Sequence, residues 1–272
     1  MAREIDRIDR PIERGASEQV LRKRLVLRPG AYEAQSPFLS LAEDWFAAPG
    51  GFETHPHRGM QTVTLVLEGA LRHRDHTGGD GILGPGDVQW MTAGRGVLHS
   101  EMPHGGASVH SLQLWLNLPA AAKMIPSRYV DQPLAAVPMR RAAGGQARVY
   151  AGRSGEVAHR HGSDWPLVFV DIEIAAGGRF EQEMPASYRG FLYFLAGSAR
   201  IGADRVTAPD VAWFEPGAGD SIAINADAPC RCLFFASPPI DEPVVAYGPF
   251  VMNTLDEIRQ AFADYQANRL TG

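Results

Sequence analysis

Short apolar segments alternate with polar positions through most of the chain, and turns rich in glycine and proline separate them. Examples are RLVLRPG, QTVTLVLEG, GDVQWMTAG and LQLWLNLP. Side chains two residues apart on a strand point to the same face, so this alternation predicts β-strands. With 29 glycines and 20 prolines, there is little room for long helices. Regular short strands separated by such turns favour an all-β sandwich or barrel.

The strand pattern occurs twice. QTVTLVLEGALRHRD resembles FLYFLAGSARIGADR, and GPGDVQWMTAG resembles APDVAWFEPGAGD. The offset of about 125 residues indicates a duplicated domain rather than a short repeat. We therefore predict an N-terminal barrel over residues 1–140 and a C-terminal barrel over residues 141–272. The linker between them is expected within residues 134–163, a stretch rich in Pro, Gly and Ala.

The end of the chain follows a helical pattern instead. Thr254 and Glu257 form a capping-box signature at its start. Apolar side chains then recur at helical spacing, at Leu255, Ile258, Phe262 and Tyr265. We predict a terminal amphipathic helix, belonging to the C-terminal domain, whose apolar side packs on a barrel.

Charge and composition exclude several classes of function. The formal net charge is −5 with no basic block, which disfavours direct nucleic-acid binding. Neither an apolar run long enough to span a membrane nor the apolar stretch of a signal peptide is present, so a cytoplasmic protein without membrane contact is expected. A monomer is the default. Cys230 and Cys232 are interpreted as reduced thiols beside a core, with a redox pair or metal site as the alternative.

Two pairs of potential metal ligands stand out. His55 and His57 are two residues apart, as are His99 and Glu101. On extended chain, each pair presents both side chains to one face. Two such pairs on neighbouring strands could surround one metal ion. Imidazoles with one carboxylate suit divalent Fe, Mn, Ni, Cu or Zn.

Four longer motifs carry a family resemblance: HPHRGMQTVTLVLEG, GPGDVQWMTAGRGVLHSEMP, LQLWLNLP and DEPVVAYGPFVMNT. Together they resemble the pirin family of the cupin superfamily over nearly the whole chain. The resemblance implies two cupin (jelly-roll) β-barrels in tandem with a C-terminal α-helix. It also implies one divalent metal ion, Fe(II) first, held by His55, His57, His99 and Glu101. Gln61 departs from the family pattern, because pirins commonly keep a Glu there that is not a ligand; its effect on the surroundings of the metal stays open.

Other polar residues are interpreted more simply. The last histidine is His161, and Glu183 and Pro185 stand roughly where a second HxH pair would be, so the C-terminal barrel is expected to hold no metal. His159 and His161 are assigned to a solvated loop. His73 and His76 are assigned to an exposed turn, with an accessory metal or substrate-entry role as the alternative. Gln113, a polar residue in an apolar strand, is a candidate to face the cavity, and His104 and His110 are candidates to border it.

The resemblance further implies an activity. Several pirins resemble quercetin 2,3-dioxygenases, so the expected function is ring opening of a flavonol, such as quercetin, with O2 and release of carbon monoxide. Glu101 is the candidate catalytic base for the proton of the flavonol 3-hydroxyl. Another aromatic or enol-containing substrate is the intermediate case. The alternative class is a regulatory protein that binds a protein partner in a metal- or redox-dependent way, without turnover.

Overall fold

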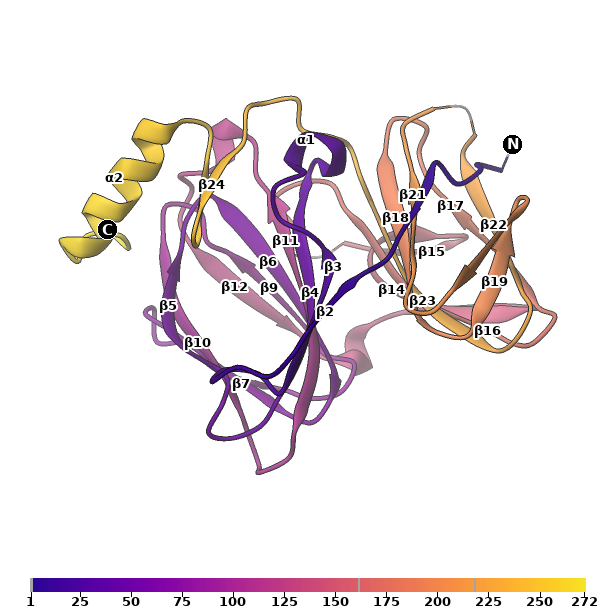
Figure 1. Cartoon of the computed structure of the whole chain (residues 1–272), viewed down its shortest axis with the longest axis horizontal. Helices are drawn as coiled ribbons and strands as arrows, with labels where there is room; N and C mark the ends of the chain where they lie inside the picture. The colour runs from indigo at the N-terminus through magenta and orange to yellow at the C-terminus, as the bar shows by residue number, and fades with distance from the viewer. Residues whose placement is uncertain (1, 161, 218) are drawn as a thin grey trace. The chain divides into compact units, whose positions relative to one another are not determined.

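The computed structural model describes residues 2–160, 162–217 and 219–272, so the expectation for His161 lies outside the described residues. The chain divides into two compact units. The first unit contains Ile12–Ala135, Gly162–Asp164 and Ile240–Gly272. The second unit contains residues 2–11, residues 136–160 and Trp165–Pro239. The predicted all-β architecture with a C-terminal helix is confirmed (Figure 1).

The compact units differ from the predicted domains at both ends of the chain. The N-terminal strand β1 (Arg7–Asp9) pairs with β21 (Val211–Phe214) in the second unit. The C-terminal helix belongs to the first unit, although the sequence prediction places it with residues 141–272. The placement of each chain end depends on contacts between segments more than 150 residues apart. A local sequence pattern cannot predict such contacts.

The first unit contains two antiparallel sheets. The larger has the order β12-β9-β6-β11-β4-β3-β2 among the described residues, and the smaller has the order β5-β10-β7-β8 (Figure 1). The strands of the larger sheet are β12 (Arg128–Gln132), β9 (Val88–Thr92), β6 (Met60–Glu68), β11 (Val109–Asn117), β4 (Phe38–Phe46), β3 (Arg22–Leu27) and β2 (Ile12–Arg14). Those of the smaller are β5 (Phe52–His57), β10 (Val97–Pro103), β7 (Leu71–Asp75) and β8 (Asp80–Leu83). Short helical turns occupy α1 (Tyr32–Gln35), η1 (Ala120–Ala122) and η2 (Leu134–Ala136).

The second unit repeats this arrangement. Its larger sheet has the order β1-β21-β18-β23-β16-β14-β13, with β15 on β14, and its smaller sheet has the order β17-β22-β19-β20. The remaining strands are β13 (Met139–Ala142), β14 (Gly145–Ser154), β15 (Val157–His159), β16 (Val168–Ile174), β17 (Arg179–Glu183), β18 (Arg189–Ala196), β19 (Ser198–Ile201), β20 (Asp204–Thr207), β22 (Ser221–Ala226) and β23 (Cys230–Ser237).

The core of the second unit is apolar. Phe180, Ile222 and Ile224 project from β17 and β22 into one cluster of buried side chains that also includes both cysteines. The cysteines are free and buried, and burial raises the pKa of the Cys230 thiol to about 11. A thiol with so high a pKa is a poor nucleophile and metal ligand, which agrees with the prediction of two reduced core residues.

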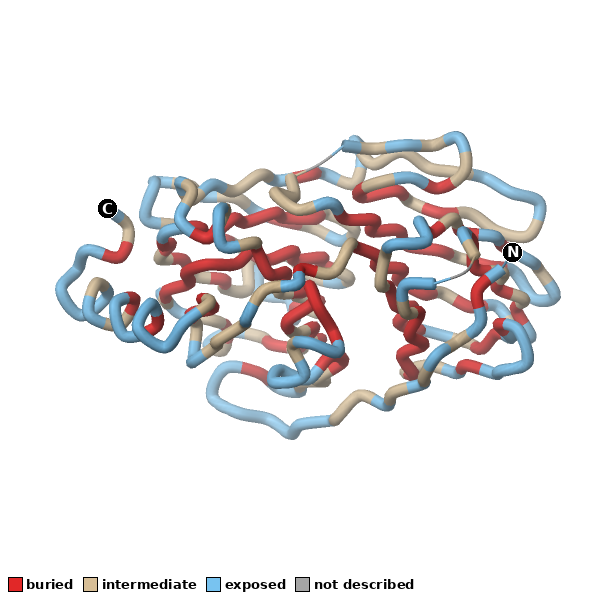
Figure 2. The backbone as a smooth tube through the Cα atoms, turned by 90° about the horizontal axis from the view of Figure 1, so that it is seen from above, coloured by how far each residue is buried: buried red, intermediate tan, exposed pale blue. Residues whose placement is uncertain are grey.

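The C-terminal segment forms the hairpin β24 (Val245–Tyr247) and β25 (Phe250–Met252), followed by α2 (Leu255–Gln266). The predicted capping box is present, because the Glu257 amide donates to Thr254 Oγ1 while the Thr254 amide donates to Glu257 Oε2. Ile258 packs with the hairpin, whereas Leu255 is exposed, so only part of the predicted apolar stripe is buried. Exposed residues make up most of the helix at the C-terminal end of the chain (Figure 2). Neither this helix nor any other in the described residues is long and apolar enough to span a membrane.

The buried ammonium group of Lys123 connects the C-terminal hairpin to the barrel of the first unit through hydrogen bonds. Lys123 is 1% exposed, and its Nζ donates to Asn117 Oδ1 (2.6 Å) and to the carbonyl oxygens of Gly59 (2.8 Å) and Val251 (3.1 Å). Burial lowers the pKa of Lys123 to about 8. The ammonium thus joins the turn after β5 to β25 through three hydrogen bonds.

We expect Lys123→Met to lower the free energy of unfolding by about 1–3 kcal/mol at pH 7, because buried acceptors lose their donor. The difference should grow as the pH rises. The folded pKa, about 8, lies below the ordinary 10.5, so the unfolded chain binds more protons between those values and the wild type gains stability there. Urea unfolding at pH 7, 8, 9 and 10 checks this, with exposed Arg259→Met as control. A difference independent of pH would contradict it.

Candidate metal centre

Three histidines meet inside the barrel of the first unit. His55 and His57 lie on β5, and His99 lies on the neighbouring β10. The strands are antiparallel, with His99 opposite His55 and Val97 opposite His57. Residues two apart share a face, so the HxH spacing delivers both β5 rings to the interior, and the strand register brings the third ring beside them.

The three rings are close enough to share one ion. Their centroids are 4.3 Å apart for His55 and His99, 4.9 Å for His55 and His57, and 5.1 Å for His57 and His99. One nitrogen of each ring lies within 4.8 Å of the other two. Among the described residues this is the one group of three or more potential ligand side chains with such spacing.

The hydrogen bonds of these rings leave nitrogens available to a metal. The Nδ1 of His55 and the Nδ1 of His57 lie 2.7 Å and 3.3 Å from the carbonyl oxygens of Glu53 and Pro249. A carbonyl oxygen only accepts, so each Nδ1 carries its hydrogen and each Nε2 presents a lone pair. His57 Nε2 and both nitrogens of His99 are buried and receive or donate no hydrogen bond within the described structure.

Burial keeps these imidazoles neutral. It lowers the pKa of His57 to about 3, with a further contribution from neighbouring His55, and it holds the pKa of His99 well below its ordinary value. Neutral imidazole is the form that binds metal ions. Buried nitrogens without a hydrogen bond on His57 and His99, beside the neighbouring neutral ring of His55, fit a metal ion, and these three histidines could hold one.

Glu101, the fourth predicted ligand, lies close by but outside the three-histidine group. A register shift in β10 separates it from His99. Its two carboxylate oxygens accept from Gln113 Nε2 at 3.0 and 2.9 Å, and one also accepts from Thr64 Oγ1 at 3.3 Å. Gln113 is itself oriented, because Trp115 Nε1 donates to its Oε1 at 3.0 Å. Burial raises the pKa of Glu101, although the hydrogen bonds from Gln113 and Thr64 lower it.

A cavity of about 470 Å³ opens onto these residues. Its walls are largely apolar, and its polar lining includes His55, His57, Glu101 and Gln113. The interpretation of Gln113 as a cavity residue is therefore confirmed. The apolar lining comes from both sheets and the C-terminal hairpin: Leu25, Pro29, Tyr32, Leu39, Ala42, Phe52, Trp115, Ala246, Pro249 and Val251. A volume of this size accommodates a small organic ligand.

His73 is not the exposed turn residue that the sequence suggested. It lies on β7 opposite Glu101 and is fully buried, and its ring centroid is 5.2 Å from those of His99 and Tyr129. The missed signal is the alternation in LRHRD, where Leu71 and His73 face inward. The second histidine of that pair, His76, is exposed as expected.

Gln61 forms hydrogen bonds with residues 162 and 163, which lie in the predicted linker region, rather than with the histidines. Its Nε2 donates to Thr92 Oγ1 (3.0 Å) and to the Gly162 carbonyl (2.6 Å), and its Oε1 accepts from Ser163 Oγ (2.9 Å). A carboxylate at this position could not donate to the Gly162 carbonyl. The glutamine thus provides both a donor and an acceptor that hold linker residues to β6 and β9, a role that the sequence did not reveal.

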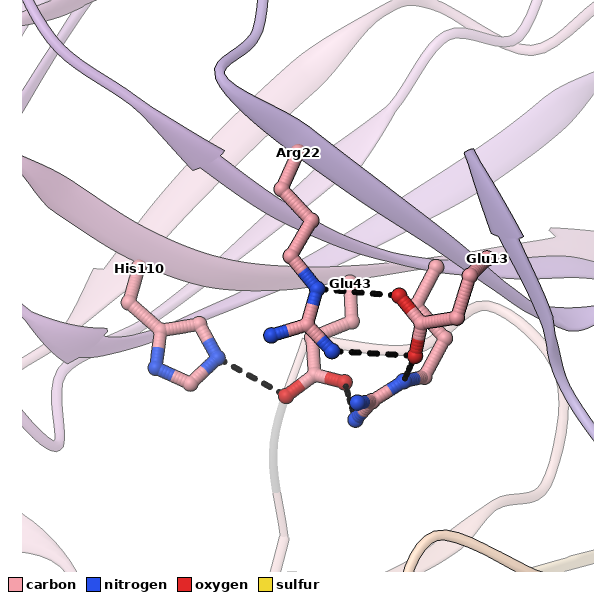
Figure 3. Close-up of polar contacts among 5 residues, drawn as sticks. Glu13, Arg22, Glu43 and His110 are labelled. Atoms are coloured by element: carbon pink, nitrogen blue, oxygen red, sulfur yellow. Dashed lines mark hydrogen bonds and ion pairs between the residues drawn. The ribbon is translucent and has the colours of Figure 1, made fainter. Parts of the chain in front are cut away.

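A separate polar cluster joins β2, β3, β4 and β11 (Figure 3). Glu13 accepts from Arg22 and Arg24, Arg24 also pairs with Glu43 at 2.6 Å, and Glu43 accepts from His110 at 2.8 Å. The two arginines lower the pKa of Glu13 to about 2. None of these side chains lines the cavity described above, so the expectation that His110 borders it is wrong.

Known proteins with similar sequences identify the family. The family profile described as "Pirin" matches residues 27–116, and that described as "Pirin C-terminal cupin domain" matches residues 169–271. A pirin-like protein of Solanum lycopersicum is 41% identical over 236 residues, covering 86% of this chain and 81% of the relative. Human pirin is 37% identical over 239 residues, covering 85% and 81%.

A comparison with a solved structure supports the same family at the level of the fold. The quercetin 2,3-dioxygenase of Acinetobacter baumannii superimposes with a TM-score of 0.91 at 28% sequence identity, covering 99% of each chain. The resemblance in the motifs, the two-barrel architecture and the profile matches to both halves agree. The chain belongs to the pirin family of two-barrel cupin proteins.

Proposed function

We propose that this protein is a metal-dependent dioxygenase that opens the ring of a flavonol such as quercetin with O2. The observation that carries the proposal is a group of three neutral histidines, two of which line a largely apolar cavity together with a buried carboxylate. The relative of A. baumannii, named a quercetin 2,3-dioxygenase, supports the substrate class. An apolar cavity with a few polar groups at one place suits a flat aromatic molecule that carries an enol.

The proposed ligands of one divalent ion, Fe(II) first and Ni, Mn, Cu or Zn otherwise, are His55, His57, His99 and Glu101. Imidazole and carboxylate donors suit all of these metals. When bound, the metal would supply Lewis-acid stabilisation of the enolate oxygen of the substrate.

The proposed role of Glu101 is to take the proton of the 3-hydroxyl on a carboxylate oxygen. Burial raises its pKa, which strengthens it as a base. Gln113 donates to both carboxylate oxygens and is oriented by Trp115, so the pair would keep the carboxylate in a defined position. The apolar walls would orient the flavonol rings and exclude water from the enolate.

Elemental analysis of protein purified from its own host, followed by an aerobic flavonol assay, tests the proposal. We expect about one metal ion per chain, with consumption of O2 and release of carbon monoxide when quercetin is added. Protein stripped by a chelator is the control and should show neither. Fully metal-loaded protein that turns over no flavonol would contradict the proposal, and a redox-dependent protein partner found alongside would favour the regulatory class.

A further inference from the structure

The cavity has a second polar region besides the metal centre. Lys23 on β3 and Asp44 on β4 stand directly opposite each other in the sheet, and both line the cavity. Lys23 Nζ lies 3.3 Å from Asp44 Oδ1. The Asp44 side chain is 7% exposed and that of Lys23 is 31% exposed. The carboxylate therefore faces the interior while its partner reaches toward solvent.

Asp44 has unused hydrogen-bonding capacity. Lys23 Nζ, 3.3 Å away, is the ion-pair partner of Oδ1, and Oδ1 receives no further hydrogen bond from the described residues. A carboxylate oxygen can accept more than one hydrogen bond, and buried polar groups in native structures are usually hydrogen-bonded. A ligand hydroxyl in the cavity could donate such a hydrogen bond.

The position of Asp44 relative to the metal centre follows from strand register. Gln113, which holds Glu101, stands opposite Ala42, and Asp44 lies two residues further along β4. Two residues of strand span roughly 7 Å. That is about the length of one aromatic ring with a substituent on its far edge. Ala42, at the level of Gln113, lines the cavity together with Leu25 and Phe52.

We propose that Asp44, paired with Lys23, is a specificity-determining residue that accepts a hydrogen bond from a hydroxyl on the outer ring of the substrate. The inference rests on the proposed function for the class of substrate, a flavonol. Hydrogen bonds to a charged acceptor are stronger than those between neutral groups. Asp44 therefore selects hydroxylated aromatic substrates over unsubstituted ones.

Calorimetric titration of metal-loaded protein without O2 separates binding from turnover. The probes are quercetin, which carries hydroxyls on both outer rings, and 3-hydroxyflavone, which carries none there. The measured quantity is the ratio of the two affinities. In Asp44→Ala, we expect this ratio to fall at least about tenfold, because a hydrogen bond to a charged group is lost. Asp44→Asn, nearly identical in shape, should reduce the ratio in the same direction. Asp256→Asn, exposed on α2, is the matched control.

The results of the titration distinguish the selective role of Asp44 from the proposed dioxygenase activity. An unchanged ratio in both Asp44 variants, or an equal loss of affinity for both probes, overturns the selective role of Asp44. A wild type that binds quercetin with Asp44-dependent selectivity but never opens its ring upholds this inference and refutes the dioxygenase proposal. A wild type that binds neither probe overturns both. Thermal unfolding of each variant shows whether a reduced affinity ratio results from loss of the folded structure.

Discussion

Replacing His99 by alanine is expected to reduce metal affinity by more than about 100-fold and to remove flavonol turnover with it. Loss of a partner that only supports a metal ligand already costs 10–100-fold, and His99 is proposed as a ligand itself. Both of its nitrogens are buried without hydrogen bonds, so the ring has no other polar role in the described structure. Metal content after desalting, competition with a chelator, and O2 consumption measure the effect.

The control for this variant is His104→Ala, in the turn after β10 and outside the cavity lining. Thermal unfolding of the metal-free proteins separates loss of a ligand from loss of the fold, because alanine at position 99 also leaves a small cavity. Metal content equal to that of the wild type in His99→Ala would exclude this residue from the ligand set.

Replacing Glu101 by glutamine is expected to lower flavonol turnover by about 10²–10⁴-fold while metal remains bound, because an amide cannot take the substrate proton. The three histidines would still supply ligands. The amide group of Gln113, which donates to both carboxylate oxygens, would face one amide oxygen and one NH2 group in the variant. The measurement is the turnover rate per bound metal ion, with metal content determined on the same sample.

The per-metal rate distinguishes the two roles proposed for Glu101. If Glu101 acted only as a ligand, turnover and metal content would fall together and the rate per metal ion would stay constant. Turnover close to that of the wild type at full metal loading would remove Glu101 from the role of base. Thr64→Val, which deletes the weaker 3.3 Å hydrogen bond to the same carboxylate and the 3.1 Å hydrogen bond that Thr64 Oγ1 accepts from Gln113 Nε2, is a matched control with a smaller expected effect.

Where a feature depends on residues close together in the chain, the sequence was sufficient to predict it. The HxH pair lies on β5 with both rings inward because alternate residues of a strand share a face. The capping box of α2 spans four residues and formed as predicted. The family motifs are also local, and they indicate the two-barrel architecture by themselves.

The tertiary structure was needed for features that depend on which residues of two paired strands stand opposite each other. The burial of His73 follows from its place opposite Glu101, and the alignment of Asp44 with Lys23 follows from the pairing of β3 with β4. The donation from Gln61 to the linker, and the exchange of the two chain ends between the units, join segments 100 or more residues apart.

The sequence by itself thus determined the residue types of the metal centre and the strands that carry them. Only the tertiary structure decided that His73 lies beside His99, how Gln113 holds Glu101, and what lines the rest of the cavity. The physical reason is that periodicity along one strand defines which face a side chain occupies, whereas register between strands defines its neighbours. A register shift such as the one between His99 and Glu101 changes those neighbours and leaves no mark on either strand alone.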